Sequence, residues 1–288
     1  MASIRQLKTR IRSVKNTRQI TKAMELVAAS KMRRAQDAAQ ATSLYARSAF
    51  ELLTHLAARD VTDDHPLFTQ REIKTRLIVV VTSDKGLAGA YNANVFKRYV
   101  QLLKADDAAG IRNETLAIGR KGAQFVTRLK DTEIVGAYEG LPDQPNGAEV
   151  RAIMATILDK FTSGQVDAVD VIYTEYINSI TQEVTSKRLL PAGFMEVPVS
   201  VEVAQARFEP SAREVLEGAT RRLVEAQIFQ ALLDATASEH SMRMLAMKNA
   251  TDNANELVDD LTLAMNKVRQ ASITQEIAEI SSGAEAVS

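Results

Sequence analysis

A long run without helix breakers, at residues 211–283, constrains the fold of this chain more than any other feature. The run contains no proline, and its one interior glycine, Gly218, lies near its start. Through it, small and apolar residues recur at spacings of three and four, the heptad period of a left-handed coiled coil. The expected C-terminal seam comprises Ala226, Phe229, Leu233, Thr236, His240, Arg243, Met247, Ala250, Ala254, Leu257, Leu261, Ala264, Val268 and Ala271. We therefore expect one continuous helix that packs along a partner helix.

The start of this run carries the signals of a helix N-terminus. Pro210 cannot continue a helix backward, and Ser211 with Glu214 three residues later forms a capping-box pattern. At about 1.5 Å per residue the helix would be roughly 110 Å long, several times the radius of a globular domain. His240 and Arg243 are polar seam positions, which usually fix the register of a coiled coil. A functional contact is the alternative interpretation of this pair.

A second heptad pattern occupies the N-terminus. Ser3 and Gln6 again form a capping-box pattern, and no glycine or proline follows until Pro66. The expected N-terminal seam comprises Ile4, Leu7, Ile11, Val14, Met32, Ala35, Ala39, Thr42, Ala46, Ala49, Leu53 and Leu56, with Ile20, Met24 and Val27 on the apolar side of a locally shifted middle. The simplest arrangement pairs the two helices antiparallel. It places Met24 near Leu245 and extends the C-terminal helix past Ser3.

The segment between the two helices has a different composition. All six prolines and ten of the twelve glycines lie from Pro66 to Pro210. We predict three domains: an N-terminal helix at 1–60, a central domain at 74–200 and a C-terminal helix at 211–286. The expected central strands are Arg76–Ser83, Thr115–Gly119, Glu133–Tyr138, Ala168–Tyr176 and Glu183–Leu190, and the expected helices are Val95–Lys104, Gly122–Lys130 and Glu149–Phe161.

Alternation of strands and helices predicts a mostly parallel sheet with right-handed crossovers. The first strand is a continuous run of β-branched and apolar residues, typical of a strand covered on both faces. The predicted fold class is therefore α+α/β, a long antiparallel left-handed coiled coil of the terminal helices plus a central Rossmann-like α/β domain.

Composition excludes several classes of function. The chain has no cysteine, which excludes disulfides and thiol chemistry, and no apolar run long enough to span a membrane. Residues 1–34 hold ten Lys and Arg against Glu25 alone, as a mitochondrial transit peptide would, but the heptad pattern continues past any cleavage point. In an antiparallel pair this basic stretch would lie near the acidic residues of 252–260. A solvated or protein-binding helix face is therefore favoured over nucleic-acid binding.

The turn that follows the first strand is the one candidate for a small-molecule site. Asp84, Lys85, Gly86 and Gly89 lie where dinucleotide-binding folds place a phosphate loop. The turn lacks the third glycine of that motif, and no lysine precedes a serine or threonine as a P-loop requires. A structural turn or a partner contact is the favoured interpretation. The three histidines are scattered, so we expect no catalytic residue, no metal site and no cofactor.

Three separated blocks of the chain together match one family. The blocks are Ile11–Thr17 with Ile20–Met24, then Ser83–Gly89, and finally Met247–Ala254 with Ile273–Ile277 and Ser282–Ala284. In these blocks the chain resembles the gamma subunit of the rotary, proton-driven ATP synthase of bacteria. They occur in the family's order, and the resemblance covers essentially the whole chain. Ala88 departs from the family, which often has cysteine there. The insert that carries redox cysteines in chloroplast members is absent.

The resemblance implies a set of partners and contact residues. The terminal helices would form a shaft inside a ring of alpha and beta subunits, and the central domain would join the epsilon subunit and the membrane ring of c subunits. Arg269 and Gln270 match positions that hydrogen-bond a catch loop of a beta subunit. Lys22 and Met24 match the region near the beta subunit's lever loop. The residues of the shaft tip would be Ile273, Thr274, Glu276 and Glu279.

The resemblance also implies a function. The chain would be a non-catalytic rotor subunit that couples proton flow to ATP synthesis or hydrolysis by rotation. It would lie at the cytoplasmic face of the inner membrane, peripherally, with no membrane insertion and no nucleic-acid partner. The alternative from the residues alone is a Rossmann-type nucleotide-binding enzyme with a coiled-coil oligomerisation arm.

Overall fold

The computed structural model describes residues 3–57, 65–129, 132–143, 147–192 and 212–285. In chain order the elements are α1 (Ile4–Ala57), β1 (Thr75–Val81), α2 (Tyr91–Ala109), β2 (Arg112–Ile118), α3 (Arg120–Val126), β3 (Glu133–Tyr138), α4 (Gly147–Thr162), β4 (Ala168–Tyr176), β5 (Gln182–Leu190) and α6 (Ala212–Glu285). All strands and helices expected in the central segment are present, with ends that differ by a few residues. The capping-box pair Ser211 and Glu214 is not fully described, because Ser211 lies outside these ranges.

The chain divides into two compact units, each built from parts of both long helices. Met1–Ala28 and Met244–Ser288 form the first, here called the hairpin unit. Ala29–Arg243 form the second, here called the sheet unit. The expected fold class is confirmed, because two long helices accompany a mostly parallel sheet.

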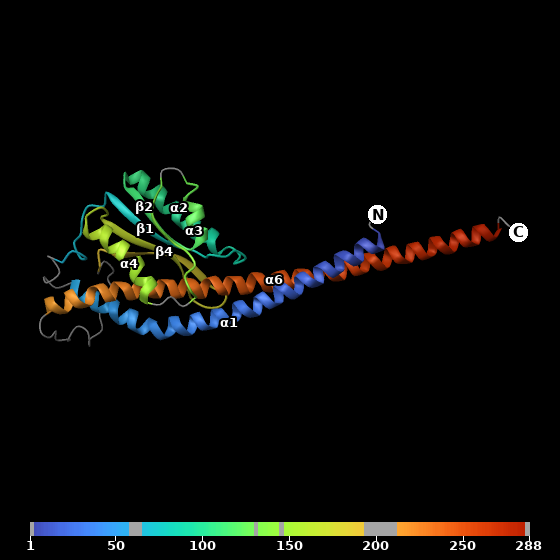
Figure 1. Cartoon of the computed structure of the whole chain (residues 1–288), viewed down its shortest axis with the longest axis horizontal. Coiled ribbons are helices and arrows are strands. Elements are labelled where there is room, and N and C mark those ends of the chain that lie inside the picture. Colours follow the sequence, from blue (N-terminus) through green and yellow to red (C-terminus); the bar gives the residue numbers. More distant parts are fainter. Residues whose placement is uncertain (1–2, 58–64, 130–131, 144–146, 193–211, 286–288) are drawn as a thin grey trace. The chain divides into compact units, whose positions relative to one another are not determined.

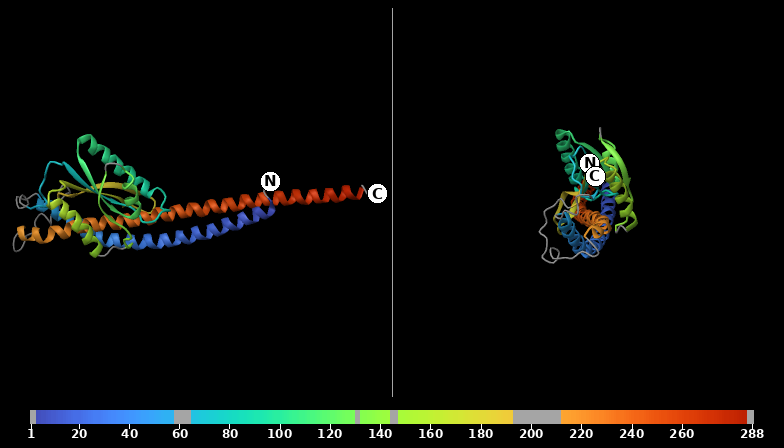
Figure 2. Two further views of the ribbon diagram at one scale, coloured as in Figure 1. Left: turned by 45° about the horizontal axis from the view of Figure 1, so that its top comes forward. Right: turned by 90° about the vertical axis from the view of Figure 1, so that its left-hand side faces the viewer.

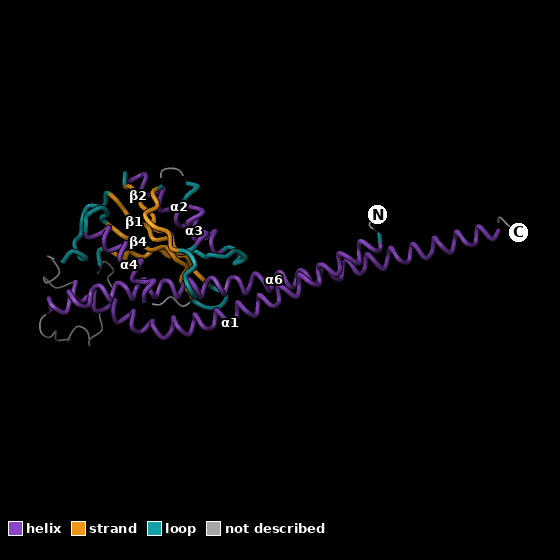
Figure 3. Tube along the Cα trace, in the orientation of Figure 1, coloured by secondary structure: helices purple, strands orange, loops and turns teal. Residues whose placement is uncertain are grey.

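The sheet unit contains five strands in the order β3-β2-β1-β4-β5. β1, β2, β3 and β4 are parallel to their neighbours, and β5 pairs antiparallel with β4. In Figure 3 these strands lie together at the centre of the unit with helices around them. The carboxyl ends of β1 and β4 therefore lie next to each other, at the edge where the turn at residues 83–90 begins.

Both faces of this sheet are covered. Leu77 and Val79 of β1 belong to a core formed with α4 and α6, whereas Ile78 and Val80 belong to a second core formed with α2 and α3. Figure 1 shows the two pairs of helices on opposite sides of the sheet. Burial on both faces explains why β1 is a continuous apolar run rather than an alternating one.

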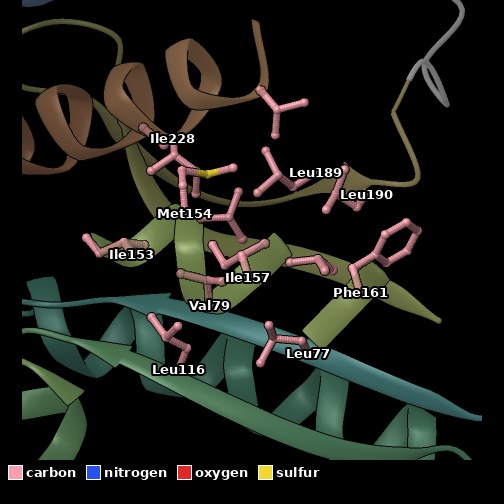
Figure 4. Packing of buried hydrophobic residues seen from close by; sticks show 14 of the residues in the cluster. Leu77, Val79, Leu116, Ile153, Met154, Ile157, Phe161, Leu189, Leu190 and Ile228 are labelled. Atoms are coloured by element: carbon pink, nitrogen blue, oxygen red, sulfur yellow. The ribbon is translucent and has the colours of Figure 1, made fainter. Parts of the chain in front are cut away.

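The larger core lies between the sheet, α4 and α6. Figure 4 shows Ile153, Met154 and Ile157 of α4 between the strands and Ile228 of α6. These four side chains are 1% exposed or less. α6 also contacts α1 in this unit, because Thr42 donates a hydrogen bond of 2.8 Å to Gln230. Because α6 packs against the sheet core as well as against α1, the stripe of buried residues on α6 is wider than the predicted seam. Leu223, Val224 and Leu232 are buried, whereas the seam residues Ala226 and Phe229 are only partly covered.

In the hairpin unit, α1 and α6 run antiparallel, as Figure 2 shows. The predicted capping box is formed: Gln6 accepts from the backbone N–H of Ser3 at 2.9 Å, and Ser3 accepts from that of Gln6 at 3.3 Å. The buried Thr21 and Thr251 hydroxyls are 2.8 Å apart. This pairing is about one turn away from the predicted level of Met24 with Leu245.

The expected phase shift in the middle of α1 is wrong. The buried residues continue in strict heptads through Thr21, Ala28 and Ala35, whereas Ile20 and Val27 are 60% and 56% exposed. On α6 the predicted Met247 and Ala254 are buried, but Leu257 is 44% exposed and Val258 takes its place. In α1 the error came from following apolar residues rather than the period. In α6 the predicted row kept the period, but the buried row includes Thr251 and Val258, each one residue beyond the predicted position.

Candidate partner-contact sites

The turn after β1 is held by hydrogen bonds to three other parts of the sheet unit. The carboxylate of Asp84 accepts from the backbone N–H groups of Arg120 and Gly140, both at 2.9 Å. The carbonyls of Lys85 and Gly86 accept from Arg243 of α6. Gly89 has a φ of 56°, which glycine adopts without strain. These contacts support the interpretation of a structural turn.

One side chain of this turn is not used in packing. Leu87 is 62% exposed and has a φ of 64°, which is uncommon for a residue with a branched side chain. The turn thus presents an apolar side chain outward while its polar groups bind inward.

The polar seam residues His240 and Arg243 form the buried part of a polar cluster whose outer members, Asp143 and Lys31, are partly exposed. Arg243 donates to Glu239 at 2.6 Å and lies 3.0 Å from Nδ1 of His240. His240 Nε2 lies 2.9 Å from Asp143, whose second oxygen binds Lys31 of α1 at 2.8 Å. The sequence identified His240 and Arg243 as exceptions to the seam. It gave no signal for Asp143, which reaches the cluster from the loop before α4.

Burial and neighbouring carboxylates shift the pKa of His240 in opposite directions, and burial and hydrogen bonds do the same to the pKa of Asp143. Burial lowers the pKa of His240 below its ordinary value, with a smaller contribution from Arg243, against the raising effects of Asp143 and Glu239. Burial by itself would raise the pKa of Asp143, but its hydrogen bonds to Lys31 and His240 outweigh this effect and lower the pKa. The cluster is therefore favoured as a neutral imidazole beside an ionised carboxylate.

The expected contact residues of α1 lie on a partly apolar surface. Lys22 forms an exposed ion pair of 3.0 Å with Glu25, and Met24 is half-buried. Close to them, Ile20, Leu26 and Val27 are each more than half exposed. The heptad pattern missed this surface because it assigned Ile20 and Val27 to the interior.

The expected contact residues of α6 are all solvent-exposed. Arg269 and Gln270 lie on the surface of the helix, and every described residue from 273 to 282 is exposed. The side chain of Gln275 binds Glu279 at 2.9 Å, and Ser272 binds Glu276 at 3.3 Å. These are bonds within one helix. Figure 1 shows this end of α6 continuing past the start of α1. The structure does not bring Arg269 and Gln270 together with Lys22 and Met24 in one site.

Exposed large apolar side chains concentrate in the hairpin unit. They are Ile20, Leu26, Val27, Leu257, Leu263, Ile273, Ile277 and Ile280. Water-exposed apolar surface on this scale is typical of a protein that binds other macromolecules. Among the described residues, no helix has the length and hydropathy to cross a membrane, and no group of three or more potential metal ligands is found.

The chain combines a helical hairpin that exposes apolar side chains with a Rossmann-like domain whose turn after β1 is held by the protein's own groups, features typical of a subunit that binds other chains. The sequence profile of the ATP synthase family matches residues 3–287. An ATP synthase gamma chain from Stenotrophomonas maltophilia is 41% identical over 288 residues and spans the full length of both chains. One from Acidithiobacillus ferrooxidans is 41% identical over 292 residues, again at full length. The chain belongs to the ATP synthase gamma-chain family.

Solved structures agree with this assignment. A chain from the central stalk and c-ring of the Tetrahymena thermophila mitochondrial ATP synthase is 26% identical, with a TM-score of 0.63, over 80% of this chain and 99% of its own length. A chain from the Euglena gracilis mitochondrial ATP synthase has a TM-score of 0.69 at 18% identity, over 99% of this chain and 94% of its own. The second likeness concerns the fold alone.

Proposed function

We propose that this chain is the central rotor stalk of a proton-translocating ATP synthase, which couples proton flow through a membrane ring to ATP synthesis or hydrolysis by rotating. The full-length identity of 41% to gamma chains carries this proposal. The exposed apolar side chains of the hairpin unit support it, because a shaft within a ring of subunits needs a surface that its neighbours cover.

The chain contributes asymmetry rather than catalytic groups. Exposed apolar side chains such as Ile20 and Leu26 lie on the hairpin unit beside charged ones such as Lys22, so a surrounding subunit meets a different surface as the unit turns. A shaft of this kind shifts the populations of open and closed subunits only through differential contact with the two states. Ion pairs between exposed side chains of neighbouring subunits are worth about 0–1 kcal/mol each, weak enough to be made and broken in every turn.

The proposed partners follow from the same function. Alpha and beta subunits surround the hairpin unit, whereas the epsilon subunit and the ring of c subunits bind the central domain. The complex lies peripherally at the cytoplasmic face of the inner membrane.

The domain division at 1–60, 74–200 and 211–286 separates the shaft from the central domain. Asp84, Lys85, Gly86 and Gly89 form a turn that supports a partner contact through Leu87.

Two groups of residues are proposed as contacts to beta subunits. Lys22 and Met24 face the lever loop, and Arg269 with Gln270 bind the catch loop near the shaft tip of Ile273, Thr274, Glu276 and Glu279. A guanidinium beside an amide offers several donors in a fixed geometry, which suits a carboxylate or carbonyl acceptor. Both side chains are exposed, so neither contributes to packing within this chain.

Replacing Arg269 and Gln270 together by alanine tests the catch contact. We expect assembly and thermal melting to remain unchanged, and ATP hydrolysis and proton pumping to fall several-fold, because each charge-assisted hydrogen bond is worth roughly 1.5–3 kcal/mol before solvent screening. The matched control is Lys267→Ala, an exposed cation of the same helix that is assigned no contact. Wild-type rates in the double variant at equal subunit content would exclude these residues as the catch.

Reconstitution tests the function as a whole. The chain is mixed with the alpha and beta subunits of the same enzyme, and the mixture is separated by size. We expect one complex that hydrolyses ATP. In parallel, the isolated chain is titrated with a labelled nucleotide, for which a rotor predicts no binding. Saturable nucleotide binding without formation of a complex would instead support an enzyme with a coiled-coil arm.

A further inference from the structure

The hydrogen bonds around His240 define which of its nitrogens carries the proton. Arg243 has only donors, and its Nη1 lies 3.0 Å from Nδ1 of His240, so Nδ1 must accept. The proton of the neutral ring therefore lies on Nε2, which donates to Asp143 at 2.9 Å. His240 is 4% exposed, so its ring nitrogens are largely removed from water, whereas the side chain of Asp143 is 44% exposed. The geometry fixes one tautomer of a neutral imidazole.

Arg243 links this imidazole to the turn after β1. Its Nη2 donates to the carbonyls of Lys85 and Gly86, each at 3.3 Å, and its Nε approaches the Gly86 carbonyl at 3.4 Å. All these residues belong to the sheet unit. The guanidinium thus connects α6 to the backbone of the turn, and the imidazole binds the guanidinium's remaining nitrogen, Nη1.

The charged groups that face His240 come from three elements. Glu239 and Arg243 lie on its own helix, Asp143 lies on the loop before α4, and Lys31 of α1 binds the far oxygen of Asp143. The two carboxylates favour a charged ring, whereas burial and Arg243 oppose it. A proton added at Nδ1 would face the guanidinium directly, and two cations in contact repel.

We propose that His240 is a positioning residue whose neutral imidazole holds Arg243 against the turn at residues 83–90, and that protonation of Nδ1 releases this turn from α6. The link is complete at neutral and alkaline pH. It opens in acid, because the accepting nitrogen becomes a donor while Arg243 has no acceptor to offer. The proposal concerns contacts within this chain and does not depend on the rotor function.

The sign of the pH dependence follows from the same contacts. Because the folded protein favours the neutral ring, the pKa of His240 lies below its ordinary value of about 6.5. The stability that the neutral cluster contributes is complete above that ordinary value. It is lost as the pH falls through the lower value of the folded state.

Nitrogen-15 NMR of the imidazoles in the full chain tests the tautomer directly. The chain has three histidines, so the signals of His240 are those that remain in both His55→Gln and His65→Gln. At about pH 8 we expect a neutral ring protonated on Nε2, with a titration midpoint below the ordinary value of about 6.5. A ring protonated on Nδ1, or one that is charged at neutral pH, would overturn the proposal.

Hydrogen exchange of the amides at residues 83–92 tests the release. Between about pH 8 and pH 5, after correction for intrinsic rates, we expect several-fold loss of protection in the wild type. In His240→Asn the amide oxygen takes the place of Nδ1 and cannot be protonated in this range, so protection should not respond to pH. His65→Gln is the matched control and should respond as the wild type does. An equal response in His240→Asn would refute the link, and the NMR measurement decides even if that variant does not fold.

Discussion

The sheet unit and the hairpin unit use the same two helices but bury very different amounts of surface. The largest fully buried side chains all lie in the sheet unit: Tyr91, Tyr99, Phe161, Leu77, Ile78, Leu116, Ile153, Met154, Ile157 and Ile172. In the hairpin unit the interior of α6 is a single row of Met247, Thr251, Ala254 and Val258. Several large apolar side chains of this unit, among them Ile20, Leu263 and Ile277, are instead exposed to solvent.

This difference separates two sources of stability. The sheet unit has a core of its own, with apolar side chains removed from water on both faces of the sheet. In the hairpin unit the narrow row of small residues removes little area per residue. Long helices with so little tertiary packing are only marginally stable in water. The stability of the hairpin unit therefore depends on the apolar surface that partner subunits bury.

Hydrogen exchange on the isolated chain should show the largest effect. We expect amides at residues 4–28 and 250–285 to exchange about a thousandfold faster than those of β1 and β4, because local opening costs far less than opening a core. Residues 223–235 of α6 should be slow, since they pack in the core of the sheet unit. Addition of alpha and beta subunits should slow the hairpin unit selectively. Uniform protection along α6 would contradict the comparison.

Removal of apolar side chains from each unit gives the next largest difference. Ile157→Ala, in the core between α4 and the sheet, should destabilise the sheet unit by about 2–5 kcal/mol. Ile277→Ala removes the same atoms from a side chain that is 59% exposed and should change stability by less than about 0.5 kcal/mol. Urea unfolding followed by near-ultraviolet circular dichroism of the tyrosines, which all lie in the sheet unit, measures the first, and hydrogen exchange of the amides around residue 277 measures the second. Equal losses would mean that the hairpin unit has a core of its own.

A buried carboxyl group should make the stability of the sheet unit depend on pH. Burial raises the pKa of Asp234 to about 6, partly offset by its hydrogen bond from Gln230. Glu175 raises this pKa further and Lys187 lowers it. Because the folded value exceeds the unfolded one, the contribution to stability is complete below about pH 4 and is lost as the pH rises through about 6.

The variant Asp234→Asn tests this dependence. Near pH 8 it should stabilise the sheet unit by roughly 1–3 kcal/mol, and near pH 4 it should have no effect. Urea unfolding at both pH values provides the measurement, and exchange in the hairpin unit serves as the internal control. If Asp234→Asn destabilises the sheet unit at both pH values, the fold requires Asp234 as an ionised carboxylate and the prediction is wrong.

Much of the fold could be predicted from the sequence because its signals are local. The buried run of β1, the alternation with helices and the Ser3–Gln6 capping box are each encoded within a few residues. The sites depend on long-range contacts and were harder to predict. Asp143 precedes its partner His240 by 97 positions in the sequence, and no sequence pattern identifies the two residues as partners.

The middle of α1 shows why an apolar pattern can mislead. Ile20 and Val27 are the most apolar residues near their positions, yet Thr21 and Ala28 are the ones buried. A pattern based on hydrophobicity assumes that apolar residues face the partner helix. In a subunit whose outer surface is itself an interface, apolar residues lie on both sides, and only the strict period of seven separates them.

The smallest predicted effect concerns the hydrogen bond at this point of the hairpin unit. The Thr21 and Thr251 hydroxyls are 2.8 Å apart, and each can also donate to a carbonyl of its own helix. Thr21→Val keeps the shape and leaves Thr251 free to donate to Met247, so no buried donor is orphaned. The loss should be about 0.5–1.5 kcal/mol, seen as a several-fold faster exchange in the hairpin unit alone. Thr17→Val is the control, because the exposed Thr17 hydroxyl binds only its own helix at Ser13. An equal effect of both substitutions would show that helix propensity, not the bond between helices, sets the stability of this unit.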